Sequence, residues 1–247
     1  MDLGFAGWAL AALAAVLVGL SKGGLPVVSM LAVPVLALVT SPITAAGLLL
    51  PVYVASDMVG LWTWRKAYDA RVLAIVAPAA VVGIGLGWAT AAVVSERMVG
   101  ALVGLIGTTF ALNAILRPRL ASARRARVVP GLFWGTVSGF TSFVSHSGGP
   151  PWQVYALPLG MDKLTFASTS TVLFAWINMV KLVPYYALGQ LSVENLRVAA
   201  ALVLPAALSV LAGARLTRII PHDVFFRIVI WALLAISLRL LWRAMFA

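Results

Sequence analysis

The chain has no cysteine and only two histidines among its 247 residues. Without cysteine there is no disulfide framework and no thiolate metal site. Charged residues are scarce as well: they make up 10% of the chain, whereas a soluble domain carries about 25%. A chain of this length with so little charge cannot cover a surface that faces water. The composition therefore excludes an ordinary soluble protein and predicts a chain that crosses a lipid bilayer several times.

Acidic residues are the scarcest charges, since seven Asp and Glu stand against 18 Lys and Arg, a formal net charge of +11. A basic excess can indicate a nucleic-acid partner. Here, however, the basic residues lie in short segments between apolar runs, which is how membrane proteins fix their orientation. The segment 117–127 contains arginines and no acid, so we expect it on the cytoplasmic side. We expect a lipid bilayer and no nucleic acid as partner.

The sequence signatures of enzymes are lacking too. The chain contains no HExxH sequence, nucleophile elbow, P-loop or dinucleotide-binding fingerprint. We therefore predict that the protein is not an enzyme, that it uses no cofactor or metal, and that any active transport by it is secondary.

What the chain has instead is a series of long apolar runs without the strict apolar/polar alternation of barrel strands. They predict an all-α polytopic membrane protein. Full-length transmembrane helices are expected at 43–64, 72–93, 98–116, 164–187, 195–214 and 223–243.

Two further apolar stretches, 5–39 and 130–160, are each interrupted by a short polar, glycine-rich break. The arms of each break are short for a hydrocarbon core of about 30 Å. Each stretch is therefore either two short tilted spans or a re-entrant hairpin, and the sequence does not choose between them. The residues of the two breaks are Ser21, Lys22, Gly23 and Gly24, and Ser145, His146, Ser147, Gly148 and Gly149.

The second half of the chain looks like a copy of the first. Asp57 matches Asn178 at the spacing that separates Thr44 from Thr165, and Pro78 matches Pro205. Chance similarity between two alanine- and leucine-rich halves is the alternative, but the ordered series of matches favours a duplicated transporter fold. The matched segments predict an N-terminal repeat at 1–116, a basic cytoplasmic linker at 117–129 and a C-terminal repeat at 130–247.

Both counts of crossings, five or three per half, are odd, so the two repeats are expected to have inverted topology. Each would consist of a glycine-broken or re-entrant first segment followed by three transmembrane helices. Inverted repeats bring their broken segments to the midplane of the membrane. The basic residues near 65–71, Arg215 and Arg218 agree with this orientation, whereas Arg239 and Arg243 do not.

A helix that begins inside the membrane leaves backbone N–H groups unpaired at its positive end, and glycines let a ligand approach them. The glycines of both breaks therefore predict an anion site. Lys22 would complement the anion, although it could instead extend to the membrane interface. The serines of the breaks could donate hydrogen bonds or cap helices. His146 could move a proton, bind an anion or be a neutral structural residue.

Asp57 is the acid deepest within an apolar run, and an intramembrane acid indicates a functional site. It could carry a proton, or it could form a structural salt bridge with Lys22 or Lys181. Asn178 and Lys181 continue a polar stripe at helical spacing with Ser168 and Thr171, which predicts a cavity lining. We predict that Asn178 and Lys181 join the residues of the breaks in binding the anion, with Asp57 as the proton-coupling residue.

These features resemble the TauE/SafE family of bacterial sulfite and organosulfonate exporters over nearly the whole chain. The resemblance implies a multi-pass transporter of the bacterial cytoplasmic membrane that exports sulfite, sulfoacetate or a related sulfur anion. The motifs that carry it are Gly19, Lys22-Gly23-Gly24-Leu25-Pro26, Thr44-Ala45-Ala46, Pro78 and Gly83, and in the second half Gly139, Ser147-Gly148-Gly149, Pro151, Asn178 and Pro205.

The leading hypothesis is thus a secondary transporter for a small sulfur-containing anion. The alternatives are a passive anion channel, a transporter of another small organic anion, and a membrane scaffold that transports nothing. The oligomeric state does not follow from the sequence.

Overall fold

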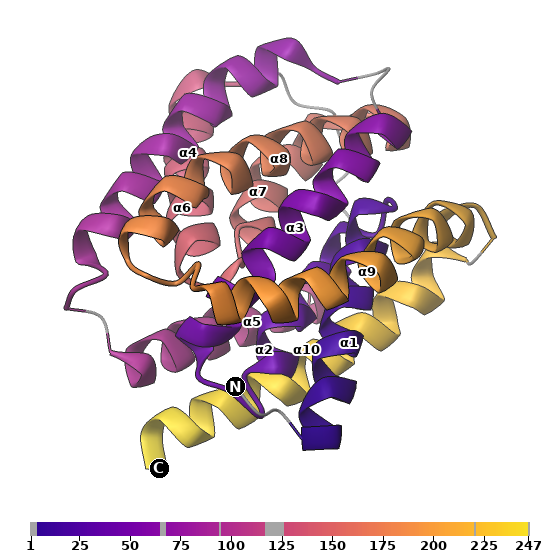
Figure 1. The fold of residues 1–247 in the computed structure, drawn as a ribbon. Coiled ribbons are helices and arrows are strands. Elements are labelled where there is room, and N and C mark those ends of the chain that lie inside the picture. The colour runs from indigo at the N-terminus through magenta and orange to yellow at the C-terminus, as the bar shows by residue number, and fades with distance from the viewer. Residues whose placement is uncertain (1–3, 65–67, 94, 117–125, 220, 247) are drawn as a thin grey trace.

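The computed structural model describes residues 4–64, 68–93, 95–116, 126–219 and 221–246. Within these ranges the chain is helical and has no strand (Figure 1). The arginine-rich segment expected on the cytoplasmic side lies outside the described residues except for its last two. The long helices are α1 (Gly4–Lys22), α3 (Pro42–Trp64), α4 (Ala70–Thr90), α5 (Glu96–Leu116), α6 (Val128–Ser145), α8 (Lys163–Ala187), α9 (Val193–Ile219) and α10 (His222–Phe246).

Five of these helices are long and apolar enough to cross a membrane. They are α1, α3, α4, α8 and α9. The largest shares of buried residues are found in α3, with 61%, and α8, with 56%. The observed helices agree with the predicted runs to within a few residues. The structure therefore confirms an all-helical chain with several membrane-spanning helices.

The return arms of the two breaks are much shorter than the helices that lead into them. After α1 the chain forms a 3-10 helix, η1 (Pro26–Leu31), and then α2 (Ala32–Leu36). After α6 it forms α7 (Gly149–Ala156) and the 3-10 helix η2 (Leu157–Leu159). At about 1.5 Å per residue, α2 and α7 extend roughly 8 and 12 Å, so neither crosses a core of about 30 Å. The return arm after α1 is thus divided between η1 and α2.

Helix starts follow the polar residues that precede them. Ser41 Oγ accepts a hydrogen bond from the Thr44 N–H at the start of α3. At the start of α8, Asp162 accepts from the backbone N–H groups of Leu164 and Thr165. The hydroxyl of Thr165 donates to the same carboxylate, and these bonds hold the pKa of Asp162 below its usual range. Because the caps satisfy exposed N–H groups, they fix where each span begins.

The long helices approach closely where glycine removes a side chain. A Cβ atom on Gly83 of α4 would lie 2.0 Å from the Thr136 carbonyl oxygen of α6. A Cβ on Gly19 of α1 would lie equally close, 2.0 Å, to the Ala206 carbonyl oxygen of α9. These two glycines therefore allow α4 to pack closely on α6 and α1 on α9. In Figure 1, α4 lies along the left of the molecule and α10, in yellow, along its lower edge.

The helices α3 and α8 contact each other in the centre of the molecule, and α9 contacts α3. Figure 1 shows α3 passing through the middle of the view, with α8 beside it. Most of the buried polar and charged side chains lie on α3, α6 and α8 or next to the two breaks. The fold therefore surrounds a polar centre with apolar helices.

Candidate functional site

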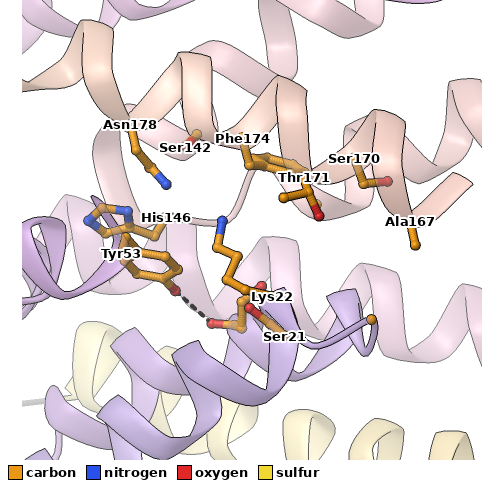
Figure 2. A pocket seen from close by; sticks show the side chains of 13 residues that line it. Ser21, Lys22, Tyr53, Ser142, His146, Ala167, Ser170, Thr171, Phe174 and Asn178 are labelled. Carbon is orange, nitrogen blue, oxygen red and sulfur yellow. Dashed lines mark hydrogen bonds between the residues drawn. The ribbon is translucent and has the colours of Figure 1, made fainter. Parts of the chain in front are cut away.

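A small pocket, about 30 Å³ in volume, opens where the end of α1 meets α3, α8 and the start of α7. Figure 2 shows it close up, with Lys22 directed from α1 toward the face of α8. The two breaks contribute Ser21, Lys22, Gly24, His146 and Gly149 to its lining. The structure thus brings these five residues of the two breaks together around one pocket.

Lys22 is the last residue of α1, and its side chain is buried. Its ammonium nitrogen lies 2.5 Å from a carboxylate oxygen of Asp57, in a pair whose side chains are 8% and 0% exposed. The ammonium also lies 5.4 Å from the ring centre of Tyr53 and 5.6 Å from that of Phe174. Lys22 therefore does not extend to the membrane interface, and the salt bridge to Asp57 is formed.

Two residues of α3 hold the end of α1 in this position. The indole N–H of Trp64 donates a 2.9 Å hydrogen bond to the carbonyl oxygen of Lys22. Gly60 leaves room for the lysine, since a Cβ there would lie 3.3 Å from the Cβ of Lys22. Trp64 is therefore a structural partner of the first break.

Asp57 and Asn178 contact each other directly. The side-chain amide of Asn178 donates a 2.6 Å hydrogen bond to the second carboxylate oxygen of Asp57. The two residues are 121 positions apart. The carboxylate thus lies between the ammonium of Lys22 and the amide of Asn178, and the buried charges of Asp57 and Lys22 compensate each other.

At the second break, His146 and Lys181 form a separate polar cluster. His146 Nε2 lies 2.8 Å from the carbonyl oxygen of Ala46, and Nδ1 lies 2.8 Å from the Lys181 nitrogen. Because a carbonyl only accepts, Nε2 carries the hydrogen and Nδ1 accepts from Lys181. Ser142 supplies two more acceptors to Lys181, its carbonyl at 3.0 Å and its hydroxyl at 3.1 Å. These three acceptors match the three N–H donors of an ammonium group.

The backbone of His146 is left-handed, with φ of 55°, and Gly24 at the other break has φ of 101°. Glycine adopts such angles without strain, whereas any other residue costs about 1–2 kcal/mol there. His146 is the non-glycine residue with positive φ among the described residues. The side-chain contacts of His146 offset this cost, because its ring stacks on Tyr53 at 4.4 Å between ring centres and 14° between planes.

Not every predicted residue lines the pocket: Asp57 and Lys181 contact it only through residues that do line it, such as Lys22 and His146. Gly23 packs on α9, where its Cβ would lie 2.6 Å from the Gly213 Cα, and Gly148 packs on α6, where its Cβ would lie 2.7 Å from the Ser138 carbonyl oxygen. Ser145 and Ser147 bond to each other at 3.1 Å and to backbone carbonyls nearby. The structure therefore places these four beside the site, where they shape the two breaks.

Several lining residues escaped the sequence analysis, above all Tyr53, Phe174 and Ser142. Tyr53 also donates a 3.1 Å hydrogen bond to the Ser29 carbonyl, which ties α3 to η1. One signal could have found two of them: Tyr53 and Phe174 have the same spacing in sequence as Asp57 and Asn178. Applied to the aromatic residues, the repeat spacing would have paired the two rings that flank Lys22.

The site as a whole is basic. Lys22 is compensated by Asp57, whereas no carboxylate among the described residues lies within ion-pairing distance of Lys181. No group of three or more His, Cys, Asp or Glu that could hold a metal occurs in the described part of the chain. Hydroxyl, amide and ammonium donors around a small pocket can bind an oxyanion, which accepts hydrogen bonds from all three.

Comparison with known proteins gave one finding. Residues 10–240 match the family model described as Sulfite exporter TauE/SafE. No curated protein and no solved structure matches the chain.

Proposed function

We propose, from the premise that the chain belongs to the TauE/SafE family of sulfite exporters, that it is a secondary transporter that binds its anion at Lys22. Membership makes the chain a multi-pass membrane transporter and not an enzyme, as the sequence predicted. The substrate class proposed here is sulfite or a small organosulfonate such as sulfoacetate. The proposed location is the bacterial cytoplasmic membrane.

The observation that carries the proposal is the buried ion pair between Lys22, which lines the pocket, and Asp57, which lies behind Lys22. An entering anion and the carboxylate of Asp57 compete for one ammonium group. Protonation of Asp57 would release Lys22 to the anion, and departure of the anion would return Lys22 to the carboxylate. Because an uncompensated charge inside the membrane is costly, this exchange couples anion binding to a proton.

A second part of the proposal is that the two halves are inverted repeats, 1–116 and 130–247, joined by the linker 117–129. Each half begins with a long helix and a short return arm, which favours re-entrant hairpins, and continues with three long helices. The contacts between the halves support this two-fold relation. Helix α1 packs on α9 as α6 packs on α4, α3 contacts α8, and α5 contacts α10.

The direct Asp57–Asn178 hydrogen bond supports the same arrangement. Equivalent residues of two repeats contact each other only near the axis that relates the repeats. The contact within this pair therefore favours an axis beside the proposed anion site. Its position agrees with the general rule that transporters with inverted repeats bind their substrates near the midplane, between the repeats.

The test is thermal unfolding of the detergent-solubilised protein with sulfite or sulfoacetate at millimolar concentration. A ligand that binds the folded form alone raises its stability by about 2.7 kcal/mol at 100 times Kd. We expect both anions to raise the Tm of the wild-type protein and of the Arg71→Gln control, and to leave the Tm of Lys22→Gln unchanged. If no anion shifts the wild-type Tm, the proposed substrate class is wrong.

Flux into liposomes separates a carrier from a passive channel. In a carrier coupled to protons, Asp57→Asn abolishes sulfite flux driven by a pH gradient but retains sulfite binding. In a channel, the same variant leaves flux unchanged. We expect the first outcome, because Asp57 contacts the residue that binds the anion.

A further inference from the structure

A second pocket, about 40 Å³ in volume, lies beyond the second break. It is formed by the start of α3, the end of α4, the end of α6 and the end of α8. Its lining is mostly apolar and includes Ala46, Phe143, Val144, Tyr185 and Gln190. The hydroxyl of Tyr185 and the amide of Gln190 are its polar side-chain groups.

The two pockets lie at opposite ends of the α3–α8 pair. Along α8 the first pocket is lined from Ala167 to Asn178, and the second is lined by Tyr185, seven positions on. Seven residues of helix extend roughly 10 Å. Along α3 the order is reversed, since Ala46 lines the second pocket and Tyr53 the first. The pockets are therefore stacked along the helices that cross the membrane.

The residues of the two pockets also correspond in sequence. Ala46 of the second pocket and Ala167 of the first are as far apart in the chain as Asp57 and Asn178. The same spacing relates Lys22 of the first pocket to Phe143 of the second. The second pocket therefore has the position of the first in the other half, with a phenyl ring where the first has an ammonium group.

A layer of side chains separates the pockets. His146 faces the first pocket, and its ring nitrogen is bonded to the carbonyl oxygen of Ala46, which lines the second. The hydroxyl of Tyr185 donates to the Phe143 carbonyl, and the two rings meet edge to face at 5.3 Å. The ring of Tyr185 lies 6.0 Å from that of His146. His146, which lines the first pocket, and Tyr185, which lines the second, therefore lie next to each other.

The hydrogen bond from Tyr185 to the Phe143 carbonyl has a counterpart near the first pocket. There the Trp64 indole donates to the Lys22 carbonyl. Trp64 and Tyr185 have the repeat spacing, and so have the two carbonyls that they bind. In each half, an aromatic side chain from the helix that follows the hairpin thus holds the end of the hairpin's first helix.

We infer that the second pocket is the outer vestibule of a single anion path and that His146 and Tyr185 form the gate between it and the Lys22 pocket. The inference rests on the proposed function for the identity of the ion, but not for the path itself. Lys22 lines the first pocket, and its carbonyl is bonded to Trp64 at the end of α3. This end of α3 leads into the basic segment 65–71, the side expected to be cytoplasmic. A small oxyanion is bound at the basic inner pocket and leaves through the outer one, where Phe143 replaces the ammonium group and holds it less tightly.

Labelling of single cysteines tests the path, because the natural chain has none to react in the background. Ala46→Cys and Ala167→Cys are a matched pair at equivalent positions of the two halves. A small membrane-impermeant thiosulfonate reagent is applied to the outer face of intact spheroplasts and, separately, to the cytoplasmic face of inverted vesicles. We expect Ala46→Cys to react from the outer face and Ala167→Cys from the cytoplasmic face. Ala45→Cys, in the apolar core beside Ala46, is the control that reacts from neither.

The gate is tested by adding Tyr185→Phe to Ala167→Cys. Loss of the hydroxyl removes its bond to the Phe143 carbonyl, so we expect Ala167→Cys to become reactive from the outer face, with a several-fold gain in rate. Val144→Cys provides a second outer position if Ala46→Cys does not fold. The inference is overturned if the outer positions react only from the cytoplasmic face or from neither face, or if Tyr185→Phe leaves the sidedness unchanged. The sidedness is measured without sulfite, so its outcome is independent of the thermal shift.

Discussion

At the scale of single residues, the stability of the folded chain depends on the buried ion pair of Lys22 and Asp57. Lys22 and Asp57 come from helices that are joined by a short return arm, and both side chains are almost inaccessible. Burying such charges is costly unless they are paired, and removal of one partner leaves the other uncompensated. The pair therefore matters for stability mainly because the loss of either residue would leave the other as a buried, uncompensated charge.

We predict that Asp57→Asn lowers the free energy of unfolding by about 3–5 kcal/mol, the range for breaking a buried pair. The double variant Lys22→Met/Asp57→Asn removes both charges, so we expect it to recover most of the loss. Denaturant unfolding in detergent measures both effects. Asp162→Asn, at an exposed helix cap where asparagine also caps well, is the control and should match the wild type. A single Asp57→Asn variant as stable as the wild type would contradict the prediction.

At the scale of elements, glycine decides how closely the helices approach. The α4–α6 contact brings Gly83 against the backbone of Thr136, and Gly139 against that of Ala80. At these points the obstacle to a larger residue is a carbonyl group, which cannot rotate away as a flexible side chain can. Gly83 on α4 and Gly139 on α6 are thus required for the close crossing of these two helices.

Gly83→Ala and Gly85→Ala are a matched pair on α4. The new Cβ at position 83 would lie 2.0 Å from the Thr136 oxygen, whereas nothing lies within 4 Å of one at position 85. We predict that Gly83→Ala lowers stability by at least about 1–3 kcal/mol, the cost of overpacking. Gly85→Ala should be neutral or stabilising by up to about 1 kcal/mol, the helix propensity of alanine over glycine. Thermal unfolding compares them, and equal Tm values would contradict the assignment.

At the scale of the whole molecule, the proposed inverted repeats fix where each connection lies. Three crossings in each half, after a hairpin that returns to its own side, put the two termini on the same face. The loop between the halves then lies on the opposite face. The basic segments near this loop favour the cytoplasm for it, so both termini are expected outside.

Reporter fusions check this topology. Alkaline phosphatase, active outside the cytoplasm, and green fluorescent protein, fluorescent inside it, are fused after Leu116 and after the last residue of the chain. We expect fluorescence from the central fusion and phosphatase activity from the C-terminal one. Fluorescence at both positions would mean an even number of crossings in the second half and would exclude inversion.

Much of the fold could be predicted because it depends on properties that are local in sequence. The apolar runs gave the long helices, and residues such as Ser41 marked where they start. The inner structure of the first return arm did not follow from the sequence, because η1 and α2 divide it. The sequence carries a break and a proline there but does not say that the arm forms a 3-10 turn, which depends on packing against α1 and α3.

By itself, the sequence determined that the chain is a helical membrane protein, and it predicted a site formed by two polar breaks together with Asp57 and Asn178. Composition and hydrophobic length suffice for this, since a bilayer penalises every charge that has no purpose or partner. Only the tertiary structure decided the partners: Asp57 for Lys22, Lys181 for His146, and α9 for Gly23. These pairs depend on which helix faces pack against each other. Helical periodicity in the sequence shows which residues share a face, but not which other helix that face contacts.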